Sequence, residues 1–229
     1  MKNIWFEGGG YACVWSFGVA EILKENNFDF NMVGGYSAGS MIAMWMLTDS
    51  SPEYVFNSIY ESPFGPKKGM FKLLKKHEYN LQHMIECILG NPIDVDINSF
   101  NNKLWIPITS ITPPFRIWRN KFRDYDDLVD CSISSQCIPF VSGKISKCFF
   151  NDSINYKTFA IDGGIIGKTP PKSWNKQNTI IVSPWGNGDI NMKPSPKITD
   201  ILFPNYDNLL HYKNIGRSQG LEFLNTYYK

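Results

Sequence analysis

The stretch Gly35-Tyr36-Ser37-Ala38-Gly39 has the pattern G-x-S-x-G, and its surroundings decide which fold the chain is expected to adopt. A short apolar stretch, residues 31–34, precedes it, and a run suited to a helix, residues 40–47, follows it. In such a strand–turn–helix the serine stands on a sharp turn, with its Oγ exposed above the edge of a sheet. The glycines are needed because larger side chains would clash with the neighbouring strand or helix. The context, more than the pattern itself, predicts that Ser37 is a nucleophile.

The composition predicts a globular protein of one domain, residues 1–229. The 229 residues are 43% hydrophobic and 19% charged, and the net charge of +2 is too small to favour nucleic acid as a partner. Aromatic residues make up 15% of the chain, which is high enough to line a groove for an apolar substrate as well as a core.

The cysteines and the N-terminal residues favour a cytoplasmic location. An odd number of cysteines with no C-x-x-C pair argues against a disulfide framework or a zinc site and for a reducing compartment. The glycines at positions 8–10 come before a signal-peptide core could form, and no apolar run approaches the ~20 residues of a membrane span. We expect neither a metal nor another cofactor. The five cysteines are Cys13, Cys87, Cys131, Cys137 and Cys148.

The hydrophobic pattern predicts strands that alternate with helices. Such alternation favours an α/β fold of three layers, in which a mostly parallel central sheet has helices on both faces. Strands are expected at residues 4–6, 31–34, 104–112, 115–122, 159–161 and 179–183, and helices at 11–26, 40–47, from 51 onward, and at 67–89, 125–136 and 207–228.

Three glycine-rich turns each follow a predicted strand. The first, Gly8-Gly9-Gly10, leaves backbone N–H groups free to hold the oxyanion of a tetrahedral intermediate. The second carries Ser37. The third, Asp162-Gly163-Gly164, would place a carboxylate at the carboxyl end of a strand, on the same sheet edge as Ser37, where it could accept the serine proton.

The first and third turns have other interpretations when each is taken alone. Gly8-Gly9-Gly10 also suits an ordinary strand–helix turn or a phosphate loop, although the dinucleotide pattern G-x-G-x-x-G fails at Cys13. An aspartate before glycine often only caps a turn.

Together, the three turns resemble those of the patatin-like phospholipase family. That family has a glycine-rich loop near the N-terminus, a G-x-S-x-G turn a few tens of residues on, and D-G-[GA] far downstream. The resemblance extends to Gly18-Val19 and to residues 134–139, and it covers about residues 3–228. Residues 180–190 are similar to the animal branch, which includes adipose triglyceride lipase and adiponutrin. The resemblance implies a patatin-like three-layer fold.

The resemblance also implies a serine–aspartate dyad. Ser37 would attack an ester carbonyl, and Asp162 would be the general base, with a pKa raised by burial. The activity implied is that of a lipid acyl hydrolase (phospholipase A, lysophospholipase or acylglycerol lipase) working through an acyl-enzyme on phospholipid or acylglycerol at a membrane or lipid-droplet surface. The oxyanion hole would be formed by Gly8, Gly9, Gly10 and Ala38, and the motif glycines are Gly35, Gly39, Gly163 and Gly164.

Two departures from the family pattern keep alternatives open. Ala12 and Cys13 replace the Arg and the last Gly of G-G-G-x-R-G, and residues 165–170 stand where Asn-Asn-Pro often follows. A non-catalytic lipid-binding or regulatory protein of the same fold would account for both departures. A Ser37–Asp162–His211 triad has the chain order of an α/β-hydrolase, but only about two strands precede Ser37, fewer than that fold requires.

A basic segment, residues 65–76, mixes five lysines with bulky apolar residues. It is expected to be helical, either as a surface helix whose apolar stripe faces the core or as part of a cap that docks on anionic lipid.

Overall fold

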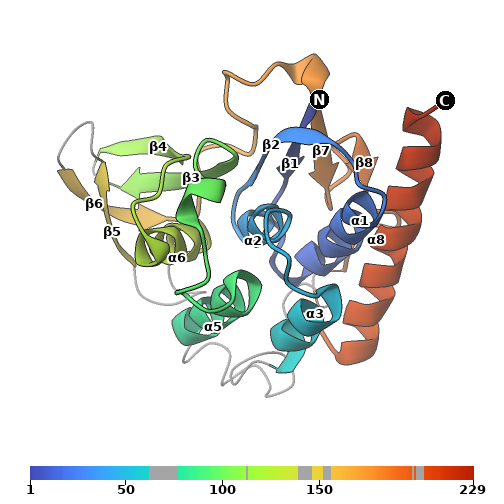
Figure 1. Ribbon diagram of the computed structural model, residues 1–229, viewed down its shortest axis with the longest axis horizontal. Coiled ribbons are helices and arrows are strands. Elements are labelled where there is room, and N and C mark those ends of the chain that lie inside the picture. The colour runs from blue at the N-terminus through green and yellow to red at the C-terminus, as the bar shows by residue number, and fades with distance from the viewer. Residues whose placement is uncertain (62–76, 112, 139–145, 152–155, 198, 200–203) are drawn as a thin grey trace.

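A computed structural model describes residues 1–61, 77–111, 113–138, 146–151, 156–197, 199 and 204–229 (Figure 1). The basic segment 65–76 lies outside these residues. The centre of the fold is an eight-stranded sheet, in which seven strands follow the order β5-β6-β3-β2-β1-β7-β8 and the eighth, β4, pairs with β3. The strands are β1 Lys2–Phe6, β2 Phe30–Gly35, β3 Leu104–Ile111, β4 Pro114–Arg119, β5 Ser146–Asn151, β6 Tyr156–Ile161, β7 Thr179–Ser183 and β8 Ile190–Asn191.

The helices alternate with these strands as the hydrophobic pattern predicts. Each helix expected from the sequence has a counterpart within about two residues, except that the described part of the one expected at 67–89 begins at His77. The α-helices are α1 Cys13–Glu25, α2 Ala38–Trp45, α3 Pro52–Glu61, α5 His77–Leu89, α6 Tyr125–Ser135 and α8 Tyr206–Tyr227, and the 3-10 helices are η1 Gly10–Ala12, η3 Ile97–Ser99 and η4 Lys176–Asn178.

The sheet is parallel around β1 and antiparallel around β3. The pairings β1–β2, β1–β7, β2–β3 and β7–β8 are parallel, whereas β3–β4, β3–β6 and β5–β6 are antiparallel. The predicted α/β fold with a mostly parallel sheet is therefore confirmed. β5 and β8 were not predicted, because β8 has two residues and the sequence of β5, Ser-Lys-Cys-Phe-Phe-Asn, does not alternate apolar with polar residues.

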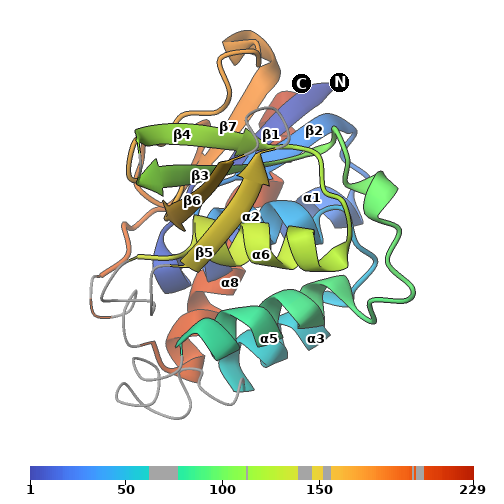
Figure 2. The same cartoon turned by 90° about the vertical axis from the view of Figure 1, so that its left-hand side faces the viewer.

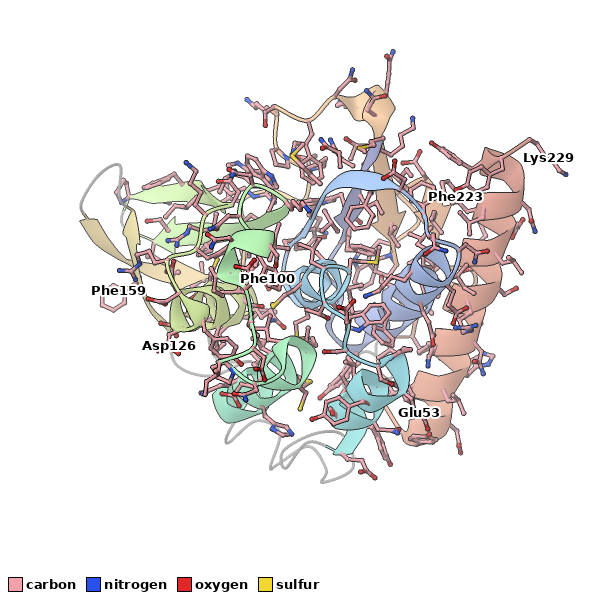
Figure 3. All side chains as sticks on the ribbon, in the orientation of Figure 1. Glu53, Phe100, Asp126, Phe159, Phe223 and Lys229 are labelled. Carbon is pink, nitrogen blue, oxygen red and sulfur yellow. The ribbon has the colours of Figure 1, made fainter. Side chains whose placement is uncertain are left out.

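The two faces of the sheet bury different side chains. Alternate strand residues point to opposite faces, and Ile4, Ile106 and Val182 join one large cluster with the buried sides of the helices. Figure 2 shows α2, α5 and α6 beneath β3 and β4. In Figure 3, Phe100 belongs to this cluster, while Phe159 on β6 points outward and is 55% exposed.

A smaller aromatic cluster lies on the other face. Trp5, Tyr36 and Trp174 form its buried part, and partly buried Met32, Trp105, Trp118 and Ile181 pack against them. Trp174 comes from the segment between β6 and β7, and its ring meets those of Trp5 and Trp105 at centroid distances of 5.9 and 6.1 Å. This segment is held to the sheet because Trp5 Nε1 donates to the carbonyl oxygen of Lys168 at 2.9 Å.

Helices α1 and α8 cross at glycines. A Cβ on Gly18 would meet the carbonyl oxygen of Lys213, and a Cβ on Gly216 would meet that of Trp15. Glu21 of α1 also forms ion pairs with Lys213 and Arg217 of α8, at 3.3 and 2.9 Å. The long C-terminal helix therefore lies directly along α1, as Figure 1 shows.

Candidate active site

The ends of β2 and β6 meet on β3. β4 pairs with one edge of β3 over Ile106–Ile111, and β6 pairs with the other, with Ile161 opposite Thr109. β2 pairs with the beginning of β3, with Gly34 opposite Trp105. Because β2 runs parallel to β3 and β6 antiparallel, their carboxyl ends face each other along β3, and a Cβ on Gly164 would lie 2.5 Å from Tyr36 Cδ2.

This topology corrects one step of the sequence reasoning. Asp162 was expected near Ser37 because both follow the carboxyl ends of parallel strands. β6 is antiparallel to β3, so that reason is wrong, and the two residues approach because their strands end facing each other. A Cβ on Gly163 would meet the carbonyl oxygen of Pro107, so only glycine leaves room for this approach.

Ser37 stands on a strained turn between β2 and α2. Its φ of 53° and ψ of −137° lie in a region that L-residues rarely adopt. Neighbouring backbone leaves no space at the flanking glycines, since a Cβ on Gly35 would lie 2.5 Å from the carbonyl oxygen of Gly39, and one on Gly39 would meet that of Phe6. Ser37 is partly exposed between the buried residues Tyr36 and Ala38. The turn therefore presents this hydroxyl and little else to the outside.

Asp162 is 5% exposed, and only one of its carboxylate oxygens is occupied. Oδ1 accepts from the Gly164 N–H at 2.8 Å, and the Asp162 N–H donates to the carbonyl oxygen of Cys137 at 2.8 Å. Oδ2 is buried and has no hydrogen-bond partner among the described residues. A free acceptor of this kind is where a proton taken from a nearby hydroxyl can go.

Burial raises the pKa of Asp162 above its ordinary value of 3.8. Three groups oppose this rise: the Ser37 hydroxyl, which hydrogen-bonds toward the carboxylate, the Gly164 N–H, and the positive charge of Arg116. Oδ2 has no partner at ordinary hydrogen-bond geometry, and the Ser37 hydroxyl faces the carboxylate.

Arg116 on β4 is a charged neighbour that the sequence analysis missed. Its guanidinium lies 4.1 Å from the centre of the Trp118 ring, and Nη1 donates to the carbonyl oxygen of Thr169 at 2.8 Å. Burial lowers the pKa of Arg116 to about 10, so it is still a cation at neutral pH. No sequence pattern marks Arg116, because its place depends on strand register: it lies opposite Thr109, which lies opposite Ile161, next to Asp162.

Ser135, at the end of α6, holds both turns in place. Its Oγ accepts from the Ser37 N–H at 3.2 Å, and its carbonyl oxygen accepts from the Gly163 N–H at 3.1 Å. Ser135 is fully buried. In the sequence, residues 134–139 stand out only by a family resemblance; in the structure, Ser135 of this stretch joins the two turns.

The loop Gly8-Gly9-Gly10 lies beside Ser37. A Cβ on Gly8 would stand 2.6 Å from the Cβ of Ser37, so a side chain at Gly8 would collide with the turn. The Gly8 N–H lies toward the Tyr36 hydroxyl. It lowers the pKa of Tyr36, which burial raises. In the part of the chain described, the N–H groups of Gly9, Gly10 and Ala38 donate no hydrogen bond, and that of Ala38 is at the first position of α2.

His83, His211, Cys13 and Cys131 stand apart from Ser37 and Asp162. His211 is exposed on α8 beside Tyr212, and His83 contacts the Cys87 sulfur at 3.7 Å. Neither contacts Ser37 or Asp162 among the described residues. Burial raises the pKa of both Cys13 and Cys131 to about 12, so both are neutral thiols at physiological pH.

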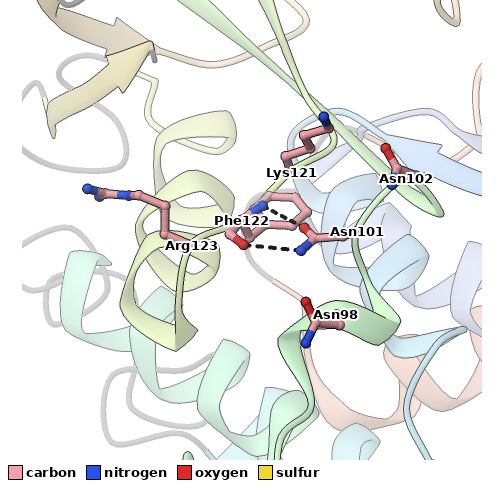
Figure 4. A pocket seen from close by; sticks show the side chains of 6 residues that line it. All are labelled: Asn98, Asn101, Asn102, Lys121, Phe122 and Arg123. Carbon is pink, nitrogen blue, oxygen red and sulfur yellow. Dashed lines mark hydrogen bonds between the residues drawn. The ribbon is translucent and has the colours of Figure 1, made fainter.

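The polar hollow shown in Figure 4 lies at the other end of β3. Asn101 closes one side of it, accepting from the Phe122 N–H at 2.7 Å and donating to the Phe122 carbonyl oxygen at 3.3 Å. These bonds join two loops, so its polar groups serve the fold. Within the residues described, no group of three His, Cys, Asp or Glu side chains is placed to hold a metal ion, and no helix has the length and apolar character to cross a membrane.

A family model described as "Patatin-like phospholipase" matches residues 4–173 of the chain. Patatin-like phospholipase domain-containing protein 2 of Mus musculus is 26% identical over 204 residues, which cover 87% of this chain and 40% of that protein. The protein of Homo sapiens named 1-acylglycerol-3-phosphate O-acyltransferase PNPLA3 is 25% identical over 211 residues, covering 86% and 40%. The chain thus spans about 40% of the length of these curated relatives.

Two solved structures share the fold at low sequence identity. VipD from Legionella pneumophila has a TM-score of 0.54 at 11% identity, over 98% of this chain and 67% of that one. The ExoU–SpcU complex of Pseudomonas aeruginosa gives a TM-score of 0.54 at 14% identity, over 99% and 51%. At these identities the likeness concerns the fold alone.

Proposed function

Since this chain belongs to the patatin-like phospholipase family, we propose that it is a serine-dependent lipid acyl hydrolase with Ser37 and Asp162 as a catalytic dyad. The observation that carries the proposal is the pairing of a partly exposed serine at positive φ with a buried carboxylate whose Oδ2 has no partner among the described residues. A strained serine and an unpartnered buried acid each cost stability, so their meeting at one point favours a catalytic purpose.

In the proposed reaction, the Ser37 Oγ attacks the carbonyl carbon of a fatty-acyl ester while its proton passes to Asp162 Oδ2. The negative charge then rests on the former carbonyl oxygen of the tetrahedral intermediate. The N–H groups of Gly9, Gly10 and Ala38 supply the hydrogen bonds for this oxyanion, each worth about 2.7–4 kcal/mol in the transition state. Gly8 provides the space beside Ser37 that a side chain would fill.

The intermediate collapses when the ester C–O bond breaks and the leaving alcohol takes the proton from Asp162. Ser37 is then acylated. A water molecule then attacks the acyl-enzyme and gives a proton to Asp162, which is ionised again. When the bond between the acyl carbon and Oγ breaks, Asp162 returns that proton to Oγ, and the fatty acid leaves. The raised pKa of Asp162 makes it a stronger base than an exposed aspartate, which this sequence of proton transfers requires.

We propose that the substrate is phospholipid or acylglycerol presented at a lipid surface, and that the protein acts there peripherally. Ile165 and Ile166, directly after Asp162-Gly163-Gly164, are 54% and 46% exposed, so apolar side chains flank the dyad at the surface. Exposed aliphatic side chains beside a reactive serine suit acyl chains.

An acyl-enzyme can also transfer its acyl group to an alcohol other than water. One relative is named as an acyltransferase, which makes transfer to a lysophospholipid a second candidate outcome of the same chemistry. Assays with and without a lysophospholipid acceptor separate the two, because transfer yields a new diacyl lipid and hydrolysis yields free fatty acid.

The test is fatty-acid release from vesicles of phosphatidylcholine and from emulsified diacylglycerol. The wild type is expected to release fatty acid from at least one, Ser37→Ala and Asp162→Asn to be inactive, and the matched control His211→Gln to retain activity. A folded wild type that binds vesicles but turns over neither lipid would support the non-catalytic alternative. Loss of activity in His211→Gln by several orders of magnitude would contradict the dyad.

A further inference from the structure

The indole of Trp185, just after β7, holds the glycine loop beside Ser37. Its Nε1 donates to the carbonyl oxygen of Gly8 at 2.7 Å. Its ring also covers the loop, since a Cβ on Gly9 would lie 3.3 Å from Trp185 Cζ2 and 3.1 Å from Pro184 Cγ. One side chain therefore both binds and shields the peptide that joins Gly8 to Gly9.

Fixing this carbonyl also fixes the Gly9 N–H. The two groups belong to one planar trans peptide and point in opposite directions. A peptide between two glycines can otherwise turn easily, because neither residue has a Cβ to restrict it. With the carbonyl held by Trp185, the Gly9 N–H points in one fixed direction. The loop lies next to the Ser37 turn, since a Cβ on Gly8 would be 2.6 Å from the Ser37 Cβ.

A buried chain of hydrogen bonds holds Trp185 in turn. The Trp185 N–H donates to Ser183 Oγ at 3.1 Å, and Ser183 Oγ donates to Glu7 Oε2 at 2.5 Å. The Glu7 N–H donates to the carbonyl oxygen of Val182 at 3.0 Å. A backbone N–H only donates, so the Ser183 oxygen accepts from Trp185 and the hydroxyl hydrogen is left to donate to Glu7.

Glu7 and Ser183 are 7% and 0% exposed. A buried carboxylate is costly unless it is hydrogen-bonded, and Glu7 directly precedes Gly8 without taking part in the proton transfers proposed for Asp162. The chain of bonds starts at Glu7, passes through Ser183 and Trp185, and returns to the residue after Glu7. Together with the covalent bond between Glu7 and Gly8, it forms a closed ring.

We propose that Trp185 is a positioning residue for the oxyanion hole, and that Glu7 and Ser183 hold it in place. This inference rests on the proposed function, because it assigns the Gly9 N–H a task in the transition state. It also gives a reason why a tryptophan that is 39% exposed follows β7 at this point, since phenylalanine would supply the ring without the donor.

The test is Trp185→Phe, which keeps an aromatic ring over Gly9 and removes the indole N–H. The Gly9 N–H stays but loses its fixed direction, so the expected fall in kcat is roughly 10- to 100-fold, less than the ~10²–10³ of a deleted oxyanion donor. KM is expected to change by less than about twofold, because the donor acts on charge that develops only in the transition state. The matched control is Trp105→Phe, which removes an indole N–H that has no partner among the described residues, and it should leave kcat unchanged.

Ser183→Ala is the second variant. It keeps the indole and removes the hydroxyl that holds the Trp185 backbone, so kcat should fall in the same direction with KM again nearly constant. Thermal unfolding identifies any variant that is not folded at the assay temperature.

Three results would overturn the inference. One is an unchanged kcat in folded Trp185→Phe when the wild type is active. Another is a rise in KM alone, which would make Trp185 a substrate-binding residue. The third is an equal fall in Trp105→Phe, which would mean that any loss of a tryptophan near the sheet has this effect. A wild type that neither hydrolyses lipid nor reacts with a fluorophosphonate would refute the proposed function itself, and this inference with it.

Discussion

Replacing Gly8 with alanine tests how tightly the glycine loop and the Ser37 turn are packed. The new Cβ would stand 2.6 Å from Ser37 Cβ, 2.8 Å from the Tyr36 carbonyl oxygen and 2.9 Å from Tyr36 Cε2. Carbon atoms pack at about 3.5–4.0 Å, so Ser37 and the loop must separate by nearly 1 Å. Tyr36 and Ser37 cannot yield cheaply, because the turn is held by Ser135 and by glycines that have no room of their own.

A displacement of about 1 Å at a reacting group costs on the order of 100-fold in rate, and overpacking costs about 1–3 kcal/mol of stability. We expect Gly8→Ala to react with a fluorophosphonate about 100-fold more slowly than the wild type and to unfold at a lower temperature. The control is Gly167→Ala, whose Cβ would have its nearest neighbour, Arg116 Nη1, at an ordinary 3.4 Å. Equal reaction rates for wild type and Gly8→Ala, with both folded, would refute the close packing of loop and turn.

The remaining predictions concern the base, the link between the turns, and the helix crossing. The rate of reaction with a fluorophosphonate should rise with pH through the pKa of Asp162, because the proposed base works only when ionised, and this acid limb should lie above 3.8 because burial raises that pKa. Arg116→Met should move the limb to higher pH, because it removes a cation that lowers the pKa of Asp162. A limb at or below 3.8 in the wild type would contradict the burial argument. Ser135→Ala leaves the Ser37 N–H without its acceptor and should lower the free energy of unfolding, measured in urea, by about 1–3 kcal/mol. A loss no larger than that of Ser58→Ala, whose hydroxyl bonds on the surface of α3, would contradict this. Gly216→Ala should destabilise the protein more than Gly220→Ala, because a Cβ on Gly216 would meet a backbone carbonyl oxygen and one on Gly220 has its nearest atom at 3.3 Å. Urea midpoints in the reverse order would show that the α1–α8 crossing is looser than described.

The order of strands and helices could be predicted from the sequence because it depends on local patterns. The strand at β7 was predicted with its observed bounds, Thr179–Ser183, since a short apolar run flanked by polar residues has few alternatives. The α6 helix begins where Asp124 accepts from the Asp127 N–H, a local cap that the sequence carries. Neither element needs a distant residue to define it.

The construction of the site could not be read in the same way, because its bonds join residues far apart in the chain. Ser135 is 98 positions from Ser37, and Trp185 is 177 positions from Gly8. The nearness of Asp162 to Ser37 was expected for the wrong reason, since it depends on β6 running antiparallel to β3. The direction and register of strand pairing decide whether these two residues meet, and one sequence does not reveal either.

The most direct test of the account is to treat the purified protein with a fluorophosphonate and locate the adduct by mass spectrometry of its peptides. The dyad predicts one adduct, on Ser37, with no adduct in Ser37→Ala and a strongly reduced rate in the nearly isosteric Asp162→Asn. A folded wild type without an adduct, or an adduct on Ser37 that forms at the same rate in Asp162→Asn, would contradict the claim that Asp162 activates Ser37.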